Sequence, residues 1–379
     1  MGIHQLIRKC DESLTKYPMR ILLLTPGAYG VTGGIALYNR DIIEAIASMP
    51  ETHEVVVLPR EVQMVLEIIP SNVRFIAEAA GRKTRFIVHC ALAMMRSYDL
   101  VICGHINLAP LAVAVAKRAC APLVMMVYGI DVWNQPSRIS SFWLKSFDSI
   151  WTISDLTCNR MNDWAQLPKP VYTVLPNAIH LDRYGMQGGP NNIRERLRLN
   201  GRKVLLTVAR LPGFDRYKGV DEILECLPDL VKIVPKLSYV IVGDGDDRRR
   251  LEDKARQLGV MDRVVFTGYI HEREKADYFR MADLFVLPGR GEGFGFVFLE
   301  ALACGVPVIG SRIDGSREAL LSGKLGELVD PRNLVEVKEA ILRGLEIPKS
   351  IPEGLSYFAW PMFTKRVQAA VRTLTSRQP

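Results

Sequence analysis

The chain has 379 residues, of which 48% are hydrophobic and 24% charged, and its formal net charge is +8. The composition is ordinary for a globular protein, and the length exceeds a single ordinary core, so we expect two domains. The positive charge is spread along the chain and is not interleaved with aromatic residues, which favours anionic ligands or an anionic membrane surface and argues against nucleic acid.

The apolar runs are too short to cross a membrane. The longest, 108–127, is broken by Pro110, Lys117, Arg118 and Pro122, whereas a spanning helix needs about 20 unbroken apolar residues. The N-terminal segment lacks the apolar core of a signal peptide. The seven cysteines form no CxxC or Cys/His cluster, which predicts free thiols in a reducing compartment. We therefore expect a cytoplasmic protein.

Short apolar runs alternate with longer amphipathic segments along the whole chain. Most of the runs are apolar throughout, as are parallel strands covered by helices on both faces. The predicted strands are 20–25, 54–59, 73–76, 99–103, 123–128, 149–153 and 171–175, followed by 203–208, 238–243, 263–268, 283–288, 307–310 and 326–330. The predicted helices include 35–49, 137–147, 218–233, 247–258 and 331–345. This alternation predicts a doubly wound α/β fold.

The alternation is interrupted once, at 177–203, which is rich in Gly, Pro and Asn and contains no predicted strand. We place the domain boundary near residue 180. The last segment is predicted to be helical after Pro361 and has no strand after it. Two Rossmann-like domains in tandem would bring the carboxyl ends of two sheets face to face. Ligands of open α/β sheets bind at those ends, so we expect the site in a deep cleft between the domains.

The first motif is the glycine-rich loop of TPGAYGVTGGIALYNR, residues 25–40, between a strand and a helix. Gly33 and Gly34 leave room for the backbone to approach a ligand, and the start of a helix favours an anion. The spacing is neither that of a dinucleotide fingerprint nor that of a P-loop. A flexible strand-to-helix connection is therefore an alternative interpretation.

The second motif carries two cations after strand 203–208. Arg210 and Lys218 flank the loop, and Gly219 opens the next helix. Arginine can bind a diphosphate as a fork and lysine can bind it as a point charge. The alternative is that both are solvated surface cations.

The third motif is the Gly-Asp-Gly turn at 243–245. Asp244 and Asp246 have the spacing of a metal-binding pair. We interpret them instead as residues that shape the turn and cap the following helix. We expect no metal site here.

The fourth motif is LPGRGEGFGFVFLEALACGVPVIG, residues 287–310. A strand ends near Pro288, a glycine-rich loop follows, and a helix is predicted from Phe296 to Cys304. Glu300, early in that helix, can accept two hydrogen bonds from the hydroxyls of a ribose. Glu292 lies in the loop, about one ligand length further out. A helix-start acid and a solvated loop acid are the alternative.

The amides at the start of the same helix belong to this motif. The backbone N–H groups of Gly295, Phe296 and Val297 can bind a phosphate or sugar hydroxyls. The glycines before them leave the backbone free to close over a ligand. We therefore expect the donor ligand to lie against this loop.

In this order, the four motifs resemble the retaining glycosyltransferases of the GT-B fold in family 4, the glycosyl transferases group 1. The segment from Glu292 to Glu300 resembles the E-x7-E signature of that group, and the resemblance covers nearly the whole chain. It implies a first domain of residues 1–180 with a terminal helix, 360–379, that crosses back to it. It implies a nucleotide-sugar domain of residues 181–359.

The resemblance also implies roles for the candidates. Arg210 and Lys218 would hold the diphosphate and stabilise the charge on it as it leaves, and Glu292 would contact the donor sugar near its 3-position hydroxyl. Gly33 and Gly34 would approach the phosphate from the first domain. Gly243 is a further donor-binding candidate. Transfer with retention in this group is usually explained by front-face attack, and it needs no divalent metal or cofactor.

One position departs from the family pattern. Many relatives have His-Gly where this chain has Tyr128 before Gly129. Either Tyr128 or Asp131 takes over part of that histidine's role, or the donor differs. His105, which follows strand 99–103, is a further candidate for the site, and a loop histidine satisfied by the backbone is its alternative.

A basic segment at 81–98 suggests a second kind of contact. Four cations border an apolar helix there: Arg82, Lys83, Arg85 and Arg96. Such a helix could rest on an anionic membrane surface, which would suit a lipid-linked acceptor. The alternative is a helix that packs on the sheet and has a basic edge.

We therefore predict a cytoplasmic, metal-independent, retaining glycosyltransferase, with peripheral contact at the inner face of the cell membrane as an option. It would move a hexose from a UDP-glucose or GDP-mannose type of donor to a growing glycan or lipid-linked acceptor in exopolysaccharide, capsule or lipopolysaccharide synthesis. One alternative is a nucleotide-sugar binding protein without catalysis. Another is a sugar phosphorylase on the same fold.

Overall fold

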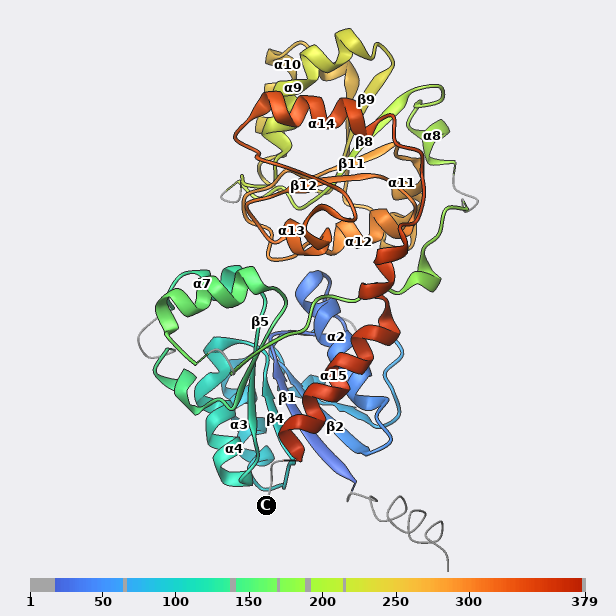
Figure 1. Cartoon of the computed structure of the whole chain (residues 1–379). Helices are drawn as coiled ribbons and strands as arrows, with labels where there is room; N and C mark the ends of the chain where they lie inside the picture. The colour runs from blue at the N-terminus through green and yellow to red at the C-terminus, as the bar shows by residue number, and fades with distance from the viewer. Residues whose placement is uncertain are drawn as a thin grey trace, which may run out of the picture. The chain divides into compact units, whose positions relative to one another are not determined.

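The computed structural model describes residues 18–63, 67–136, 141–168, 171–187, 192–213 and 216–376. These residues form two compact units. The first holds the chain up to Thr152, Cys158–Leu175 and the residues from Phe363 onward; the second holds Ile153–Thr157 and Pro176–Met362. Apart from the short excursion of Ile153–Thr157, the chain changes unit at residues 176 and 363, close to the predicted changes at 181 and 360. Figure 1 shows both units as sheets covered by helices.

The first unit contains a seven-stranded parallel sheet with the order β3-β2-β1-β4-β5-β6-β7. Its strands are β1 (Met19–Thr25), β2 (Thr52–Pro59), β3 (Val73–Phe75), β4 (Leu100–Cys103), β5 (Leu123–Val127), β6 (Ser149–Thr152) and β7 (Tyr172–Val174). The central strands β4 and β5 are buried along their whole length, and β1 is buried except at Arg20. This burial on both faces explains why the sequence runs are apolar throughout and do not alternate.

Helices cover both faces of this sheet. They are α2 (Gly34–Ala47), α3 (Lys83–Ala93), α4 (Ala109–Ala119), α5 (Ile130–Trp133), the part of α7 (Asp155–Ala165) from Cys158 onward and the part of α15 (Trp360–Thr375) from Phe363 onward, with 3-10 turns η1 (Ala77–Ala79), η2 (Ile106–Leu108) and η3 (Trp143–Ser146). Leu22 and Leu24 of β1 pack with α3 and α4 in one core cluster. Phe363 of α15 packs edge-on against Tyr38 of α2.

The second unit contains a six-stranded parallel sheet with the order β10-β9-β8-β11-β12-β13. Its strands are β8 (Lys203–Val208), β9 (Leu237–Val242), β10 (Val264–Gly268), β11 (Leu284–Val286), β12 (Val308–Ser311) and β13 (Glu327–Val329). Both sheets are parallel with helical crossovers, so the predicted doubly wound α/β fold is confirmed for each unit.

The helices of the second unit also lie on both faces of its sheet (Figure 1). They are α8 (Ile193–Arg196), α9 (Val220–Ile233), α10 (Arg248–Gln257), α11 (Glu272–Met281), α12 (Phe296–Ala303), α13 (Ser316–Ala319) and α14 (Leu334–Gly344), with 3-10 turns η5 (Leu181–Arg183), η6 (Met261–Arg263), η7 (Leu321–Gly323) and η8 (Glu353–Phe358). α9, α10 and α14 share one core cluster. On the other face, Phe285 of β11 packs edge-on against Phe298 of α12.

Two details differ from the sequence analysis. Of the helix predicted at 137–147, residues 141 and 142 are α-helical and Trp143–Ser146 form a 3-10 turn, while 137–140 lie outside the described residues. The segment 177–203, predicted without a strand, contains two short helical turns, η5 and α8. Among the described residues, no helix combines the length and the apolar character that crossing a membrane requires.

Candidate active site

The sheet of the second unit has its topological switch point between β8 and β11. From β8 the chain continues to β9 on one side, whereas β11 lies on the other side. The connections from these two strands therefore lead to opposite sides, and the carboxyl edge at such a point is where ligands of open α/β sheets bind. The predicted residues Arg210, Lys218 and Glu292 all lie in these two loops.

Glycines allow the loops of this edge to pack closely. A Cβ atom on Gly243 would come within 1.9 Å of the carbonyl oxygen of Ala209, and one on Gly245 within 2.0 Å of that of Leu211. Gly219 has a positive φ of 80°, and a Cβ there would meet the carbonyl oxygen of Pro288 at 2.6 Å. Side chains at these positions would push the loops apart, so the sequence must be glycine for this arrangement to form.

Lys218 and Glu292 form an ion pair across the switch point. The Lys218 Nζ donates to Glu292 Oε1, and both side chains are 15% exposed. The same ammonium lies 4.8 Å from the centre of the Tyr217 ring. The structure thus joins two residues 74 positions apart that the sequence analysis assigned separately to the diphosphate and to the sugar.

The loop that carries Glu292 is anchored on two sides. The N–H of Arg290 donates to the carbonyl of Tyr217 at 2.7 Å, and its guanidinium pairs with the buried Glu222 of α9. The N–H of Glu292 donates to Asp314 Oδ2 at 3.0 Å. Burial raises the pKa of Asp314 to about 6, although its N–H donors favour the ionised form.

The predicted start of α12 is confirmed at Phe296. Gly295 is its N-cap and has a φ of 93°, a left-handed conformation that favours glycine. Phe296 and Val297 are the first two helical residues, so their N–H groups have no carbonyl one turn earlier to bond. The structure therefore places these amides where a helix start can receive an anion.

Glu300 lies one turn into α12 and is only 1% exposed. Its Oε1 accepts from Lys275 Nζ of α11 at 2.6 Å and from the Tyr184 hydroxyl at 2.8 Å. Burial alone would lower the pKa of Lys275, but the charges of Glu300 and Glu272 and the hydrogen bonds to them together outweigh it, and the pKa is raised. Burial and the charge of Glu300 raise the pKa of Tyr184. Lys275 and Tyr184 therefore stay protonated, and both donate to the Glu300 carboxylate.

The second oxygen of Glu300 is different. Oε2 is buried and has no hydrogen-bond partner among the described residues. A buried acceptor without a donor costs about 1–3 kcal/mol. A carboxylate oxygen has two lone pairs, so Oε2 can accept from one or two ligand hydroxyls. The two predicted glutamates thus have separate surroundings: Glu292 faces Lys218, and Glu300 faces Lys275 and Tyr184.

Arg210 differs from Lys218 in being exposed. Within the described chain, no hydrogen bond or ion pair involves its guanidinium. It directly follows Ala209, whose carbonyl faces Gly243, so it lies at the same sheet edge as the Gly-Asp-Gly turn.

The two aspartates of that turn have structural partners. Asp244 Oδ1 accepts from the N–H of Gly245 at 2.9 Å, and Asp246 Oδ1 accepts from the N–H of Gly213 at 2.6 Å. Among the described residues, no group of three or more His, Cys, Asp or Glu side chains is arranged to hold a metal ion.

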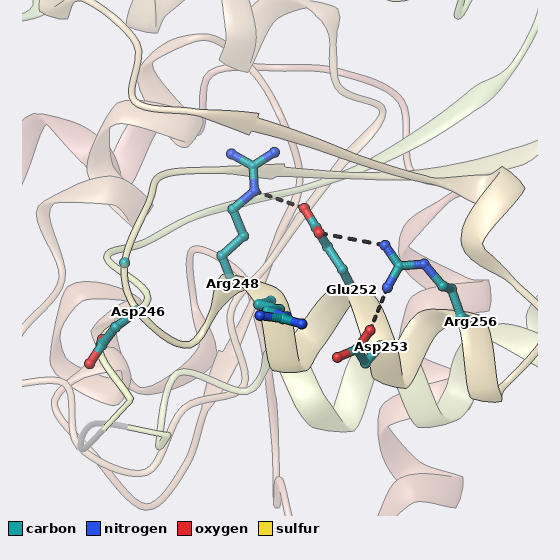
Figure 2. Close-up of a pocket in the computed structure, with 7 residues that line it drawn as sticks. Asp246, Arg248, Glu252, Asp253 and Arg256 are labelled. Atoms are coloured by element: carbon teal, nitrogen blue, oxygen red, sulfur yellow. Dashed lines mark hydrogen bonds and ion pairs between the residues drawn. The ribbon is translucent and has the colours of Figure 1, made fainter.

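A shallow pocket next to this turn is lined by charged residues of α10 (Figure 2). Its charges pair with one another: Glu252 accepts from Arg248 Nε at 2.8 Å and lies 3.7 Å from Arg256, which also pairs with Asp253. Asp246 points away from these pairs in Figure 2. We interpret this pocket as the solvated face of α10.

The first unit has its own switch point, between β1 and β4. Gly33 has a φ of 118° and is the N-cap of α2, and Gly34 is the first residue of that helix. No atom lies within 4 Å of a Cβ built on Gly33. The backbone conformation, and not crowding, therefore requires glycine here, and the start of α2 is open.

Tyr128 belongs to a buried network at this switch point. It is 8% exposed, and its hydroxyl lies 2.7 Å from Asn39 Oδ1 and 2.9 Å from the carbonyl of Gly104. Asn39 in turn donates to Thr25 Oγ1 and to the carbonyl of Gly27, each at 2.7 Å. The hydroxyl of Tyr128 therefore connects α2 with the loop after β4, and Asn39 connects α2 with the loop after β1.

Asp131 binds the backbone of the same tyrosine. Its carboxylate accepts from the N–H of Tyr128 at 3.1 Å. Burial raises the pKa of Asp131 to about 6, against the effect of its N–H donors. Burial also raises the pKa of Tyr128 well above its ordinary value, and the charge of Asp131 adds to this.

His105 caps the turn η2. Its Nδ1 accepts from the N–H of Asn107 at 3.1 Å, which leaves Nε2 to carry the proton of the neutral ring. Burial lowers the pKa of His105, so the neutral form is favoured further. The backbone thus satisfies one of its nitrogens, as the alternative interpretation of this residue expects.

Sequence reasoning missed several residues of these sites. Lys275 and Tyr184 are separated from Glu300 by 25 and 116 positions, and no spacing links them to it. Asn39 lies at the end of the first motif, within helix α2, where nothing in the sequence marks it as a partner of Tyr128. Asp314 carried a usable signal, since it closely follows strand β12 at the same edge where Arg210 and Glu292 follow their strands.

The segment that carries this candidate site is similar to known proteins. Residues 190–353 match the family model described as glycosyl transferases group 1. A GDP-mannose-dependent alpha-(1-6)-phosphatidylinositol monomannoside mannosyltransferase of Mycolicibacterium smegmatis is 36% identical over 182 residues, 46% of this chain and 47% of that protein. A glycogen synthase of Mycobacterium tuberculosis is 27% identical over 276 residues, 70% of this chain and 61% of that protein. The chain spans about half the length of the mannosyltransferases that it resembles.

Solved structures share the fold over almost the whole chain. A glycosyltransferase from Rickettsia africae superposes with a TM-score of 0.78 at 16% identity, covering 96% of this chain and 100% of the other. The Anabaena protein HepE in complex with UDP and glucose superposes with a TM-score of 0.70 at 18% identity, covering 94% and 95%.

The fold is therefore that of the GT-B class. Residues 190–353, which contain Arg210, Lys218, Glu292 and Glu300, match the family model of the glycosyl transferases group 1. The resemblance drawn from the motifs is confirmed at this level. Assignment to family 4 stays a prediction.

Proposed function

We propose that the protein is a retaining, metal-independent glycosyltransferase that moves a hexose from a nucleotide-diphosphate sugar to a glycan or lipid-linked acceptor. The observation that carries this proposal is the ion pair between Lys218 and Glu292 at the switch point of the second unit. In this proposal, Lys218 is the cation for the diphosphate and its neighbour Glu292 is the acid for the hydroxyls of the sugar.

The nucleoside end of the donor would bind at Glu300. Lys275 and Tyr184 occupy Oε1, which leaves the unpartnered Oε2 to accept ribose hydroxyls. Because Glu300 is almost fully covered, neighbouring side chains must shift for a ribose to reach it. The hydrogen bond gained would offset the cost of the buried acceptor.

The chemical step assigned to these residues is a single exchange at the anomeric carbon. The acceptor hydroxyl oxygen bonds to that carbon from the same face as the leaving diphosphate, the bond to the diphosphate oxygen breaks, and that oxygen takes the hydroxyl proton. Lys218 and Arg210 would stabilise the negative charge that develops on the diphosphate. Glu292 would hold the donor sugar through its hydroxyls.

The relatives support a hexose donor. Two mannosyltransferases that are 36% and 35% identical over 182 residues are named for GDP-mannose. An alpha-monoglucosyldiacylglycerol synthase of Streptococcus pneumoniae, 30% identical over 172 residues, is named for a glucosylated lipid. We therefore propose a donor of the GDP-mannose or UDP-glucose type and an acceptor in cell-surface polysaccharide or glycolipid synthesis in the cytoplasm.

A thermal-shift screen against nucleotide sugars, read together with donor hydrolysis, tests the proposal. We expect stabilisation by one base and sugar combination and slow release of the free sugar from that donor. Stabilisation without hydrolysis or transfer would indicate a nucleotide-sugar sensor. Turnover that uses free phosphate and no nucleotide would indicate a phosphorylase.

A further inference from the structure

The outer face of α3 in the first unit is apolar. The helix buries Phe86, Cys90 and Ala93 in the core of the unit. Its other side exposes Ile87, Val88, Leu92 and, in the turn that follows, Met95, each 51 to 81% exposed. No other stretch of nine residues in the described chain exposes four large apolar side chains.

The spacing makes these side chains one continuous surface. Val88, Leu92 and Met95 stand at i, i+4 and i+7, so they share one face of the helix. Thr84 and Ala91, both exposed, lie on the same face. α3 therefore has a packed side and an outward apolar side, whereas a surface helix ordinarily turns a polar face to water.

Cations flank this apolar surface. Arg82, Lys83 and Arg85 stand at the start of α3 and Arg96 just after its end, and all four are exposed. None of them forms an ion pair with a carboxylate within the described chain. The sequence contains no acidic residue between Glu78 and Asp99. Lys117 and Arg118, exposed at the end of the adjacent α4, add to the same charge.

We propose that the outer face of α3 docks on an anionic lipid surface. The apolar side chains would enter the boundary between headgroups and acyl chains, while the four flanking cations pair with headgroup phosphates. Apolar area alone would suit a protein partner equally well. The cations around it have no carboxylate partners, which favours an anionic partner. The continuous apolar side chains favour a partner whose interior is apolar, and an anionic lipid bilayer has both properties.

This surface lies outside the candidate active site, and docking does not require transfer. The proposal therefore goes beyond the proposed function and can hold or fail independently of it. Lipid binding here would place the first unit at the membrane.

Co-sedimentation of the full chain with vesicles tests the proposal. We expect the protein to sediment with mixed phosphatidylglycerol and phosphatidylcholine vesicles and much less with phosphatidylcholine alone. Val88→Asp with Leu92→Asp should lower this partition at least about tenfold, because charges replace the inserted side chains. Lys83→Glu with Arg85→Glu should remove the preference for the anionic vesicles. Added salt should weaken binding of the wild type.

The matched control is Ile233→Asp, which changes an equally exposed apolar residue on α9. It should sediment like the wild type, and far-UV circular dichroism with thermal unfolding should show that all variants are folded. The proposal would be overturned if the wild type did not sediment with anionic vesicles. It would also be overturned if the folded Val88→Asp/Leu92→Asp variant sedimented with them to the same extent as the wild type. Light scattering that shows a lipid-free dimer of the wild type and a monomer of that variant would identify the face as a self-interface instead.

Discussion

Lys218 and Glu292 position each other through their ion pair, so a substitution at either residue also alters the surroundings of the other. The ammonium of Lys218 is in contact with the Glu292 carboxylate and the Tyr217 ring. Removing Glu292 would leave Lys218 without its carboxylate partner. A free ammonium is a stronger site for a diphosphate, because the Coulomb attraction is no longer shared.

We expect Lys218→Ala to lower kcat/KM for transfer by about two orders of magnitude, or ~3 kcal/mol. The charge that develops on the leaving diphosphate would lose its nearest cation. Steady-state kinetics with the identified donor measure this effect. Lys236→Ala, an exposed lysine in the same unit, is the control and should leave the rate unchanged. Near-normal turnover of the Lys218 variant would refute its role.

The double variant tests whether the pair acts as a unit. Single changes at residues in direct contact are expected to be non-additive. The loss of transition-state stabilisation in the double variant Lys218→Ala with Glu292→Ala should therefore be smaller than the sum of the losses in the two single variants. Strict additivity of the free energies would show that the ion pair is incidental to the reaction.

At the scale of elements, the site depends on how closely the loops of the second sheet approach one another. The loop after β9 lies against the loop after β8 because Gly243 has no Cβ, and the segment before α13 approaches Glu292 because Gly315 has none: a Cβ there would meet the carbonyl of Gly293 at 2.2 Å. Substitutions at such glycines should act through loop geometry and not through chemistry.

Gly243→Ala should destabilise the second unit by more than about 3 kcal/mol, since a Cβ would collide with the backbone in addition to the strain of its φ of 130°. Gly259 is a matched control, because its φ is also positive, at 69°, but no atom lies within 4 Å of a Cβ there. Gly259→Ala should cost only about 1 kcal/mol. Urea unfolding measures both, and equal losses would contradict the close packing.

The strands were predictable and the side-chain partners were not. β1, β4, β8 and β9 are apolar runs buried on both faces, and such runs are visible in the sequence without knowledge of their neighbours. The partners of Glu300 come from distant segments, and only packing brings them together. Tyr128 illustrates the same limit: the sequence analysis considered it a substitute for a histidine at the site, and the structure engages its hydroxyl in a buried network.

At the scale of the whole molecule, each unit has an aspartate near its switch point whose pKa is raised. Burial raises the pKa of Asp131 in the first unit and of Asp314 in the second to about 6. A carboxyl with a higher pKa in the folded chain binds more protons when folded. The free energy of unfolding therefore falls as the pH rises from about 4 through about 6 for these two groups.

Asp314→Asn isolates this effect in the second unit. As the pH rises from 4 to 7, the wild type loses the stability that the raised pKa of Asp314 gives it, and the variant does not. The unfolding free energy of the variant relative to the wild type should therefore rise by up to about 3 kcal/mol, because the pKa is raised by about two units. Urea unfolding across this range gives the difference directly, and the other titrating groups cancel between the two proteins. Parallel stability profiles would contradict the raised pKa of Asp314.

The central claim is that the second unit binds the nucleoside diphosphate of a sugar donor, with Glu300 at the nucleoside and Glu292 at the sugar. Calorimetric titration of GDP and UDP into the wild type, Glu300→Gln and Glu292→Ala tests it most directly, with Glu346→Gln, an exposed glutamate of the same unit, as control. The account predicts that one nucleotide binds, that Glu300→Gln weakens it about tenfold, or ~1.4 kcal/mol, and that Glu292→Ala binds as tightly as the wild type or more tightly. A folded Glu300→Gln variant with wild-type affinity, or the absence of binding by either nucleotide, would contradict it.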